Sequence, residues 1–135
     1  MVSKSKIHNE RNVGVSVVSS DSVKQVQLAK GFWSKRLITG PTSGSQLFML
    51  SRVSMDPNST STGSYPDKDE ALFILKGSVR ISWNGHRKNL SPGDSVFIPM
   101  GTTTIMENGS KKSKAELLAV IAPSKTLEEL QVVVH

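Results

Sequence analysis

The sequence contains no cysteine, which excludes disulfide scaffolds, thiolate nucleophiles and zinc or iron–sulfur sites with cysteine ligands. It has no apolar run near the roughly 20 residues that cross a bilayer. Its polar start, Met-Val-Ser-Lys-Ser-Lys, lacks the apolar core of a signal peptide. Together these absences predict a soluble protein of the cytoplasm, with no membrane partner.

Aromatic residues make up only 5% of the chain, although the net charge is +6, from 17 Lys plus Arg against 11 Asp plus Glu. The basic residues occur in short clusters beside turn residues or near a terminus, without the interleaved aromatic residues of single-strand binders. We therefore expect a solvated basic surface rather than a nucleic-acid partner. The clusters are Lys4 and Lys6, Lys35 and Arg36, Arg87 and Lys88, and Lys111, Lys112 and Lys114.

The 135 residues fit one domain, at 13–135, after a flexible basic arm at 1–12. Short segments rich in β-branched residues alternate with Gly, Pro, Asn and Ser clusters, a pattern typical of an all-β sandwich or barrel. The predicted strands are 13–18, 23–28, 32–38, 46–55, 70–76, 78–83, 87–90, 95–98, 103–107 and 115–121.

Turn residues separate several of these strands. The segment 78–83 alternates apolar and polar residues, which predicts a strand with one buried face. Asn84-Gly85 then favours a type I′ hairpin turn, because both central residues of that turn need a positive φ. Pro92-Gly93 predicts a second turn.

The patterns of two segments fit more than one structure. Residues 56–69 are polar and predict a long loop, either a functional rim or a disordered segment. Near the C-terminus, Thr126-x-x-Glu129 matches a capping box and favours a short helix over 124–130. The following residues 132–134 favour a strand equally well, so the structure of this end stays open.

Two spaced motifs resemble the signature of the cupin superfamily. The first is Glu70-(six residues)-Gly77, at about 63–83. The second, at about 93–108, is Gly93-(five)-Pro99-x-Gly101-(two)-Thr104-(three)-Asn108. The resemblance covers about residues 16–123. It implies a double-stranded β-helix, the jelly-roll barrel of small RmlC-like cupins, a fold that hosts many chemistries.

Metal-binding cupins use a His-x-His pair, a glutamate and a third histidine. By resemblance these positions fall on Ser64, Pro66, Glu70 and Thr104, so three of the four ligands are missing. One carboxylate with two hydroxyls is a poor site for a transition metal, and we expect neither metal nor cofactor. The chain's histidines, which we interpret as surface residues, are His8, His86 and His135.

Alternate residues of barrel strands line the interior, so counting by twos from these positions predicts a binding site. The predicted ligand-binding residues around Glu70 are Ser64, Pro66, Leu72, Ile74, Thr102, Thr104 and Met106. Apolar walls with a few polar groups are typical of small-molecule sites. A carboxyl group there would have a raised pKa and serve as a catalytic acid or base. Alternatively, Glu70 belongs to the charged run 67–70 and faces water or a lysine.

Three hypotheses remain open. The first is a metal-independent protein that binds a small organic metabolite, carbohydrate-like or a polar acid. The second is a cofactor-free isomerase, epimerase or cyclase in which Glu70 moves a proton. The third is a homodimerisation module, since the sequence also resembles the histidine-free cupin domain of the centromere protein C family. In all three we expect a homodimer, as small cupins commonly pair through their outer sheet.

Overall fold

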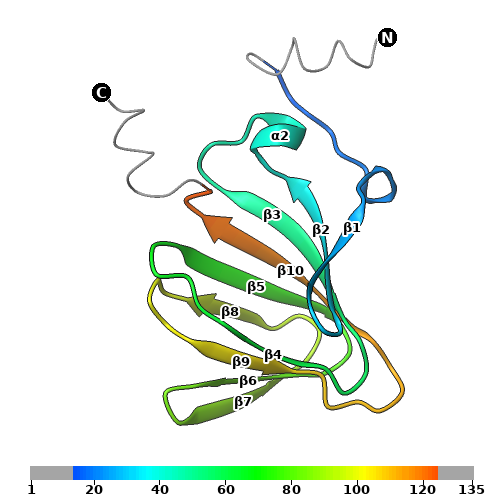
Figure 1. Ribbon diagram of the computed structural model, residues 1–135, viewed down its shortest axis with the longest axis vertical. Coiled ribbons are helices and arrows are strands. Elements are labelled where there is room, and N and C mark those ends of the chain that lie inside the picture. Colours follow the sequence, from blue (N-terminus) through cyan, green and yellow to red (C-terminus); the bar gives the residue numbers. More distant parts are fainter. Residues whose placement is uncertain (1–13, 125–135) are drawn as a thin grey trace.

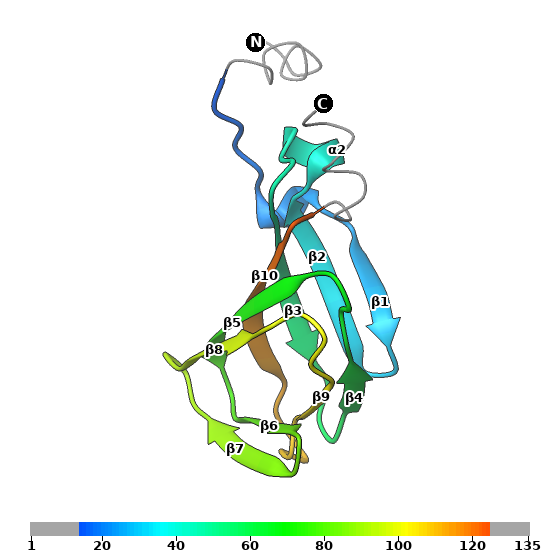
Figure 2. The ribbon, with the colours of Figure 1, turned by 90° about the vertical axis from the view of Figure 1, so that its left-hand side faces the viewer.

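The computed structural model describes residues 14–124, which form two antiparallel sheets (Figures 1 and 2). The larger sheet has the strand order β1-β2-β3-β10-β5-β8, and the smaller has the order β4-β9-β6-β7. The strands are β1 Gln25–Ala29, β2 Phe32–Ile38, β3 Met49–Met55, β4 Thr60–Gly63, β5 Asp69–Lys76, β6 Val79–Trp83, β7 His86–Leu90, β8 Ser95–Ile98, β9 Thr104–Glu107 and β10 Ala115–Ala122. This is the predicted all-β jelly-roll architecture.

Two short helices accompany the strands, the 3₁₀ helix η1 at Ser20–Ser22 and the α-helix α2 at Gly40–Ser43. Thr39 caps α2 by accepting a hydrogen bond from the Thr42 amide at 3.1 Å. The upper ends of β2 and β3 extend past the smaller sheet toward α2 (Figure 1). Residues 14–124 contain no helix that is long and apolar enough to cross a membrane.

Strand β10 shows how the sequence pattern determines the packing. Its residues alternate between buried and partly buried over the whole strand, and it pairs with β3 on one side and β5 on the other. The buried set faces the smaller sheet and joins one hydrophobic core. This core consists of Phe32, Val53, Met55, Leu72, Ile74, Val79, Ile81, Leu90, Ile98, Ala115, Leu117 and Ala119.

Nine of the ten predicted strand segments contain a strand, and the hairpin turn is confirmed by positive φ at Asn84 (44°) and Gly85 (79°). The predicted strand at 13–18 is wrong for residues 14–18, which form no strand. Val15 and Val17 are 93% and 86% exposed. The β-branched residues of this segment favour a strand, but residues 14–18 pair with no other strand. The arm at 1–12 and the alternatives for 125–135 lie outside the described residues.

The predicted loop at 56–69 contains strand β4, which the sequence analysis missed. Its residues are polar and give no hydrophobic alternation, but its backbone pairs with β9 from Thr60 opposite Glu107 to Gly63 opposite Thr104. Backbone pairing needs no particular side chains, and this explains why the composition did not reveal the strand. As a result part of the segment forms an edge strand of the smaller sheet.

Asn108, at the end of the second motif, joins the loops at one end of the barrel. It is 1% exposed, and its amide nitrogen lies 3.1 Å from the carbonyl oxygen of Met55 and 2.9 Å from that of Ser113. The side-chain oxygen of Asn108 accepts a hydrogen bond from the Ser110 backbone amide at 3.1 Å. The backbone amide of Asn108 donates to the Ser59 carbonyl at 2.9 Å. The side chain therefore satisfies backbone groups that no strand partner reaches.

We expect Asn108→Ala to lower the free energy of unfolding by about 2–4 kcal/mol, because several buried polar groups lose their partner at once. Urea denaturation measures the change. The matched control is Asn89→Ala, since Asn89 is exposed and accepts only from Arg80 Nε at 3.2 Å. This control is expected to cost less than about 0.5 kcal/mol. Equal effects of the two substitutions would contradict the structural role of Asn108.

Candidate functional site

A cavity of about 320 Å³ lies between the two sheets. One wall comes from the larger sheet and the other from β4, β9 and the segment after β4. Most of its surface is apolar, with one carboxyl group and a few hydroxyl groups. It is lined by Leu28, Phe32, Val53, Ser61, Gly63, Tyr65, Glu70, Leu72, Thr104, Met106, Leu117 and Ala119.

The structure brings four of the predicted site residues together at this cavity: Glu70, Leu72, Thr104 and Met106. Glu70 and Leu72 stand two residues apart on β5, and Thr104 and Met106 do the same on β9, facing them from the other sheet. Counting by twos along the motif strands therefore selected residues that line the same cavity from two opposite walls.

The other four predicted residues lie elsewhere. Ile74 is fully buried in the core and does not reach the cavity. Thr102 lines an adjoining cavity of about 270 Å³, to which Thr104 also contributes. Ser64 and Pro66 are exposed and line neither cavity. Both follow the end of β4 at Gly63, where the strand alternation that placed them inside no longer applies.

Glu70 is partly buried on the cavity side of β5, with Ile98 opposite it on β8 and Ile121 opposite it on β10. Among residues 14–124 its carboxyl group makes no hydrogen bond and no ion pair. Burial raises the pKa of Glu70, because the charged form loses its hydration without gaining a cation. The charged run at 67–70 thus does not place this side chain in open water.

Tyr65 is a cavity residue that the sequence analysis missed, although it lies between the two positions that resemble the histidine pair. Its backbone oxygen accepts a hydrogen bond from the Gly101 amide at 2.8 Å, which fixes it against the turn before β9. Burial raises the pKa of the Tyr65 hydroxyl, the charge of Glu70 raises it further, and the charge of Arg36 lowers it. Tyr65 is therefore close enough to sense both charged groups.

The remaining wall residues were also missed, because the counting began only from the two motifs. Phe32, Val53, Leu117 and Ala119 line the cavity from β2, β3 and β10. The signal was present in the sequence, since apolar residues alternate through 115–121 and mark one inward face. Extending the alternation to every strand would have found them.

The donor set does not fit a metal centre. Within residues 14–124 no group of three or more His, Cys, Asp or Glu side chains lies close enough together to hold a metal ion. Glu70 and the Thr104 hydroxyl supply one strong donor and one weak one at the cavity. His86 begins β7 and lies with its ring 5.4 Å from the ring of Trp83.

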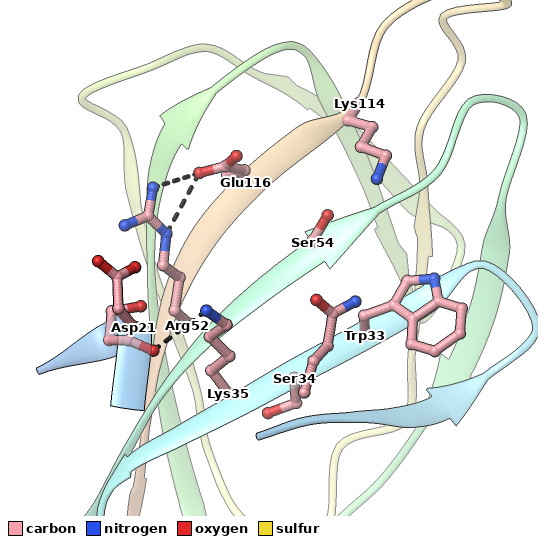
Figure 3. Close-up of a pocket in the computed structure, with 10 residues that line it drawn as sticks. Asp21, Trp33, Ser34, Lys35, Arg52, Ser54, Lys114 and Glu116 are labelled. Atoms are coloured by element: carbon pink, nitrogen blue, oxygen red, sulfur yellow. Dashed lines mark hydrogen bonds and ion pairs between the residues drawn. The ribbon is translucent and has the colours of Figure 1, made fainter. Parts of the chain in front are cut away.

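A second hollow, of about 360 Å³, is a polar groove on β2, β3 and β10 (Figure 3). Its basic side chains already have partners within the chain. Arg52 donates to Glu116 through both Nε and Nη2, and Lys35 Nζ donates to the Ser20 carbonyl at 3.1 Å. Lys114 Nζ lies 3.8 Å from a carboxylate oxygen of Asp56. Because these charges compensate one another, the interior cavity is the stronger candidate site.

Comparison with known proteins identifies the family but no single function. The cupin-domain model Cupin_2 matches residues 51–121, whereas no curated protein matches significantly. The polyketide cyclase RemF from Streptomyces resistomycificus is similar in structure, with TM-score 0.72, 23% identity, and coverage of 84% of this chain and 82% of that one.

Two further solved structures share the fold at lower identity. An RmlC-like cupin from Shewanella frigidimarina has TM-score 0.69 and 14% identity, covering 87% of this chain and 96% of that chain. The Cnp3 cupin domain of Schizosaccharomyces pombe has TM-score 0.66 and 19% identity, covering 90% and 80%. With the family model matched over residues 51–121 and both sheets in place, this chain belongs to the cupin domain family.

Proposed function

We propose that this protein is a metal-independent cupin of the cytoplasm that binds a small organic metabolite in the cavity between its sheets. The observation that carries the proposal is the Glu70 carboxyl group, which is partly buried beside apolar walls and has no polar partner among residues 14–124. Its oxygen atoms keep some contact with solvent, since residues 14–124 contain no fully buried side-chain N or O atom without a partner. A ligand in the cavity would replace this solvent contact with a hydrogen bond.

Because the pKa of Glu70 is raised by burial, its carboxyl group keeps its proton to a higher pH than a solvent-exposed glutamate does. A neutral carboxyl group donates one hydrogen bond and accepts others, which suits a hydroxyl or carbonyl group of a ligand. The Thr104 hydroxyl faces Glu70 from the other sheet and adds a second polar contact. The apolar side chains around them would hold the carbon skeleton of the ligand.

The same carboxyl group supports catalysis as the second candidate function. A carboxyl group whose pKa is raised toward neutrality is a suitable general acid or base, and Glu70 would move a proton in a cofactor-free isomerase, epimerase or cyclase. Tyr65, which lines the same cavity, provides a second proton-bearing group for such a reaction. The structural neighbour named as a polyketide cyclase shares the fold, and the proposed chemistry here rests on Glu70 and Tyr65.

We also propose that the protein forms a homodimer through the outer face of the larger sheet. Phe97 is 64% exposed there, and Phe73 is 43% exposed. Cross-strand pairing places Ala71 beside Phe97, and Leu118 beside Phe73, so these side chains form one apolar patch. An apolar patch on a sheet face that would otherwise meet water marks an interface.

Charges beside the patch favour a second copy of this chain as the partner. Leu118 of the patch pairs across the strands with Arg52, and Arg52 is bonded to Glu116 on the same face. A two-fold interface brings the same surface from both subunits together. The adjacent Arg52 and Glu116 are suited to this symmetry, since each charge then meets its opposite on the partner copy.

Native mass spectrometry and elemental analysis of protein purified without chelator test the binding function. We expect an organic mass bound to the wild type, no stoichiometric transition metal, and at least about ten-fold weaker retention of that mass by Glu70→Gln, which loses the carboxyl contact. Glu116→Gln, in the outer groove, serves as the control and should retain the ligand. Stoichiometric metal that Glu70→Ala abolishes would overturn the proposal.

The pH dependence of stability gives an independent test of the Glu70 environment. Because burial raises the pKa of Glu70 in the folded state, ionisation destabilises the fold as pH rises from the unfolded-state value of about 4.3 through the folded value. Glu70→Gln should therefore be more stable than the wild type at neutral pH. The difference should vanish below about pH 4.

Glu116→Gln provides the control of opposite sign. The hydrogen bond from Arg52 lowers the pKa of Glu116, so its ionised form stabilises the fold above the unfolded-state pKa and loses that effect as pH falls through the folded one. This variant should be less stable than the wild type at neutral pH and equal to it in acid. Thermal unfolding across pH measures both, and a destabilised Glu70→Gln protein at neutral pH would argue against a raised pKa of Glu70.

The dimer is tested by a single charge in the apolar patch. Phe97→Lys should convert the dimer to a monomer in light scattering at micromolar concentration, because two like charges would meet near the two-fold axis. Ile105→Lys is the matched control, since Ile105 is 41% exposed on β9 of the other sheet. A monomeric wild type, or equal effects of both substitutions, would refute this interface.

A further inference from the structure

Arg36 lies on the side of β2 that faces the cavity. Phe32, Ser34 and Arg36 alternate along the strand, and the irregularity in the pairing of β2 with β3 comes only after Arg36. Phe32 and Ser34 are buried, and Phe32 lines the cavity. Arg36 is exposed, on the part of β2 that leads toward α2, where the larger sheet extends past the smaller one (Figure 1). Strand alternation therefore places the Arg36 side chain on the same face of β2 as Phe32.

A row of paired residues leads from Arg36 into the cavity. Arg36 is opposite Ser51 on β3, Ser51 is opposite Ala119 on β10, and Ala119 is opposite Leu72 on β5. Ala119 and Leu72 line the cavity, and Glu70 is the next inward residue of β5 after Leu72. Ser51 and Ala119 are each 4% exposed, so this row is a packed part of the sheet that joins the position of Arg36 to the cavity wall.

Tyr65 lies over this surface from the segment that follows β4. Burial has the largest effect on the pKa of the Tyr65 hydroxyl and raises it. The charge of Glu70 raises this pKa further, and the charge of Arg36 lowers it. The charge of Arg36 thus acts on Tyr65, a residue that lines the cavity. Both the strand register and this effect on Tyr65 support a position of Arg36 near the cavity.

Arg36 also differs from neighbouring cations in its partners. Arg52 is bonded to Glu116, and Lys68 Nζ donates to the Pro123 carbonyl at 2.8 Å. Within residues 14–124, by contrast, the Arg36 guanidinium group makes no hydrogen bond or ion pair. A guanidinium group with free donors binds a carboxylate through two parallel hydrogen bonds.

Resting on the proposed function, we propose that the ligand is a small organic acid whose anionic group is bound by Arg36, while its neutral part contacts Tyr65 and Glu70. β2 and β5 are three strand spacings apart, or about 14 Å between backbones, and both side chains reach inward from that distance. The remaining gap suits a molecule of a few carbon atoms. An anion of this kind would be attracted by the positive charge of Arg36.

The geometry is tested first without any ligand, because Tyr65 is the only tyrosine in the chain. Ultraviolet titration of tyrosinate then reports this hydroxyl group alone. Arg36→Gln should raise the pKa of Tyr65 and Glu70→Gln should lower it, since each removes one of the two opposing charges. Arg87→Gln, an exposed arginine of β7, is the matched control and should leave the titration unchanged. An unchanged titration in Arg36→Gln would overturn the proposal.

The ligand class is tested with propionate, succinate and adipate, each compared with its neutral amide by calorimetry. We expect the acids to bind the wild type at least about ten-fold more tightly than the amides, a preference that Arg36→Gln loses and Arg87→Gln keeps. Equal binding of acids and amides, lost in Glu70→Gln, would overturn the acid class and leave the cavity function standing. Absence of binding by every acid would overturn the acid class as well, and a neutral mass in the native spectrum would still support the proposed function.

Discussion

The pairing of β10 between β3 and β5 is the constraint on which the rest of the molecule depends. It joins the C-terminal strand to strands from two distant parts of the chain, so the larger sheet is continuous only when all three are in register. A shift of one residue would turn Leu117 and Ala119 outward and expose the core. The same register aligns Arg36, Ser51, Ala119 and Leu72 in one row, so the packing that stabilises the fold also builds the cavity floor.

The cavity combines this stable framework with a group that opposes stability. Burial raises the pKa of Glu70, because the carboxylate form loses hydration in the folded protein. Ionisation of Glu70 therefore costs more free energy in the folded protein than in water. Asn108 illustrates the opposite arrangement, since it is only 1% exposed and both polar atoms of its side chain have hydrogen-bond partners. Polar groups that serve the fold are satisfied here, and Glu70 is the exception at the cavity.

The sequence predicted the fold well because its signals were local and repeated. Turn residues such as Asn84-Gly85 set the hairpins, and inward alternation set the strands. Strand β4 was missed because backbone pairing with β9 leaves no side-chain pattern, and the strand at 13–18 was wrong because β-branched residues need a partner strand. For the site, Glu70 and Thr104 followed from motif spacing, whereas Tyr65 and Arg36 meet them only through the fold.

The missing histidines change the electrostatics of the cavity as well as its ligand set. In a metal-binding cupin the resemblance implies a cation beside the glutamate, which would keep that carboxyl group ionised. Here Thr104 takes a histidine position, and no cationic side chain lines the cavity beside Glu70 among residues 14–124. Burial therefore raises the pKa of this carboxyl group, with no cation in the cavity to oppose the shift. In the proposed arrangement, the positive charge that a ligand meets is that of Arg36, on the inward face of β2. This arrangement favours a ligand whose charge stays at the entrance while its uncharged part enters the barrel.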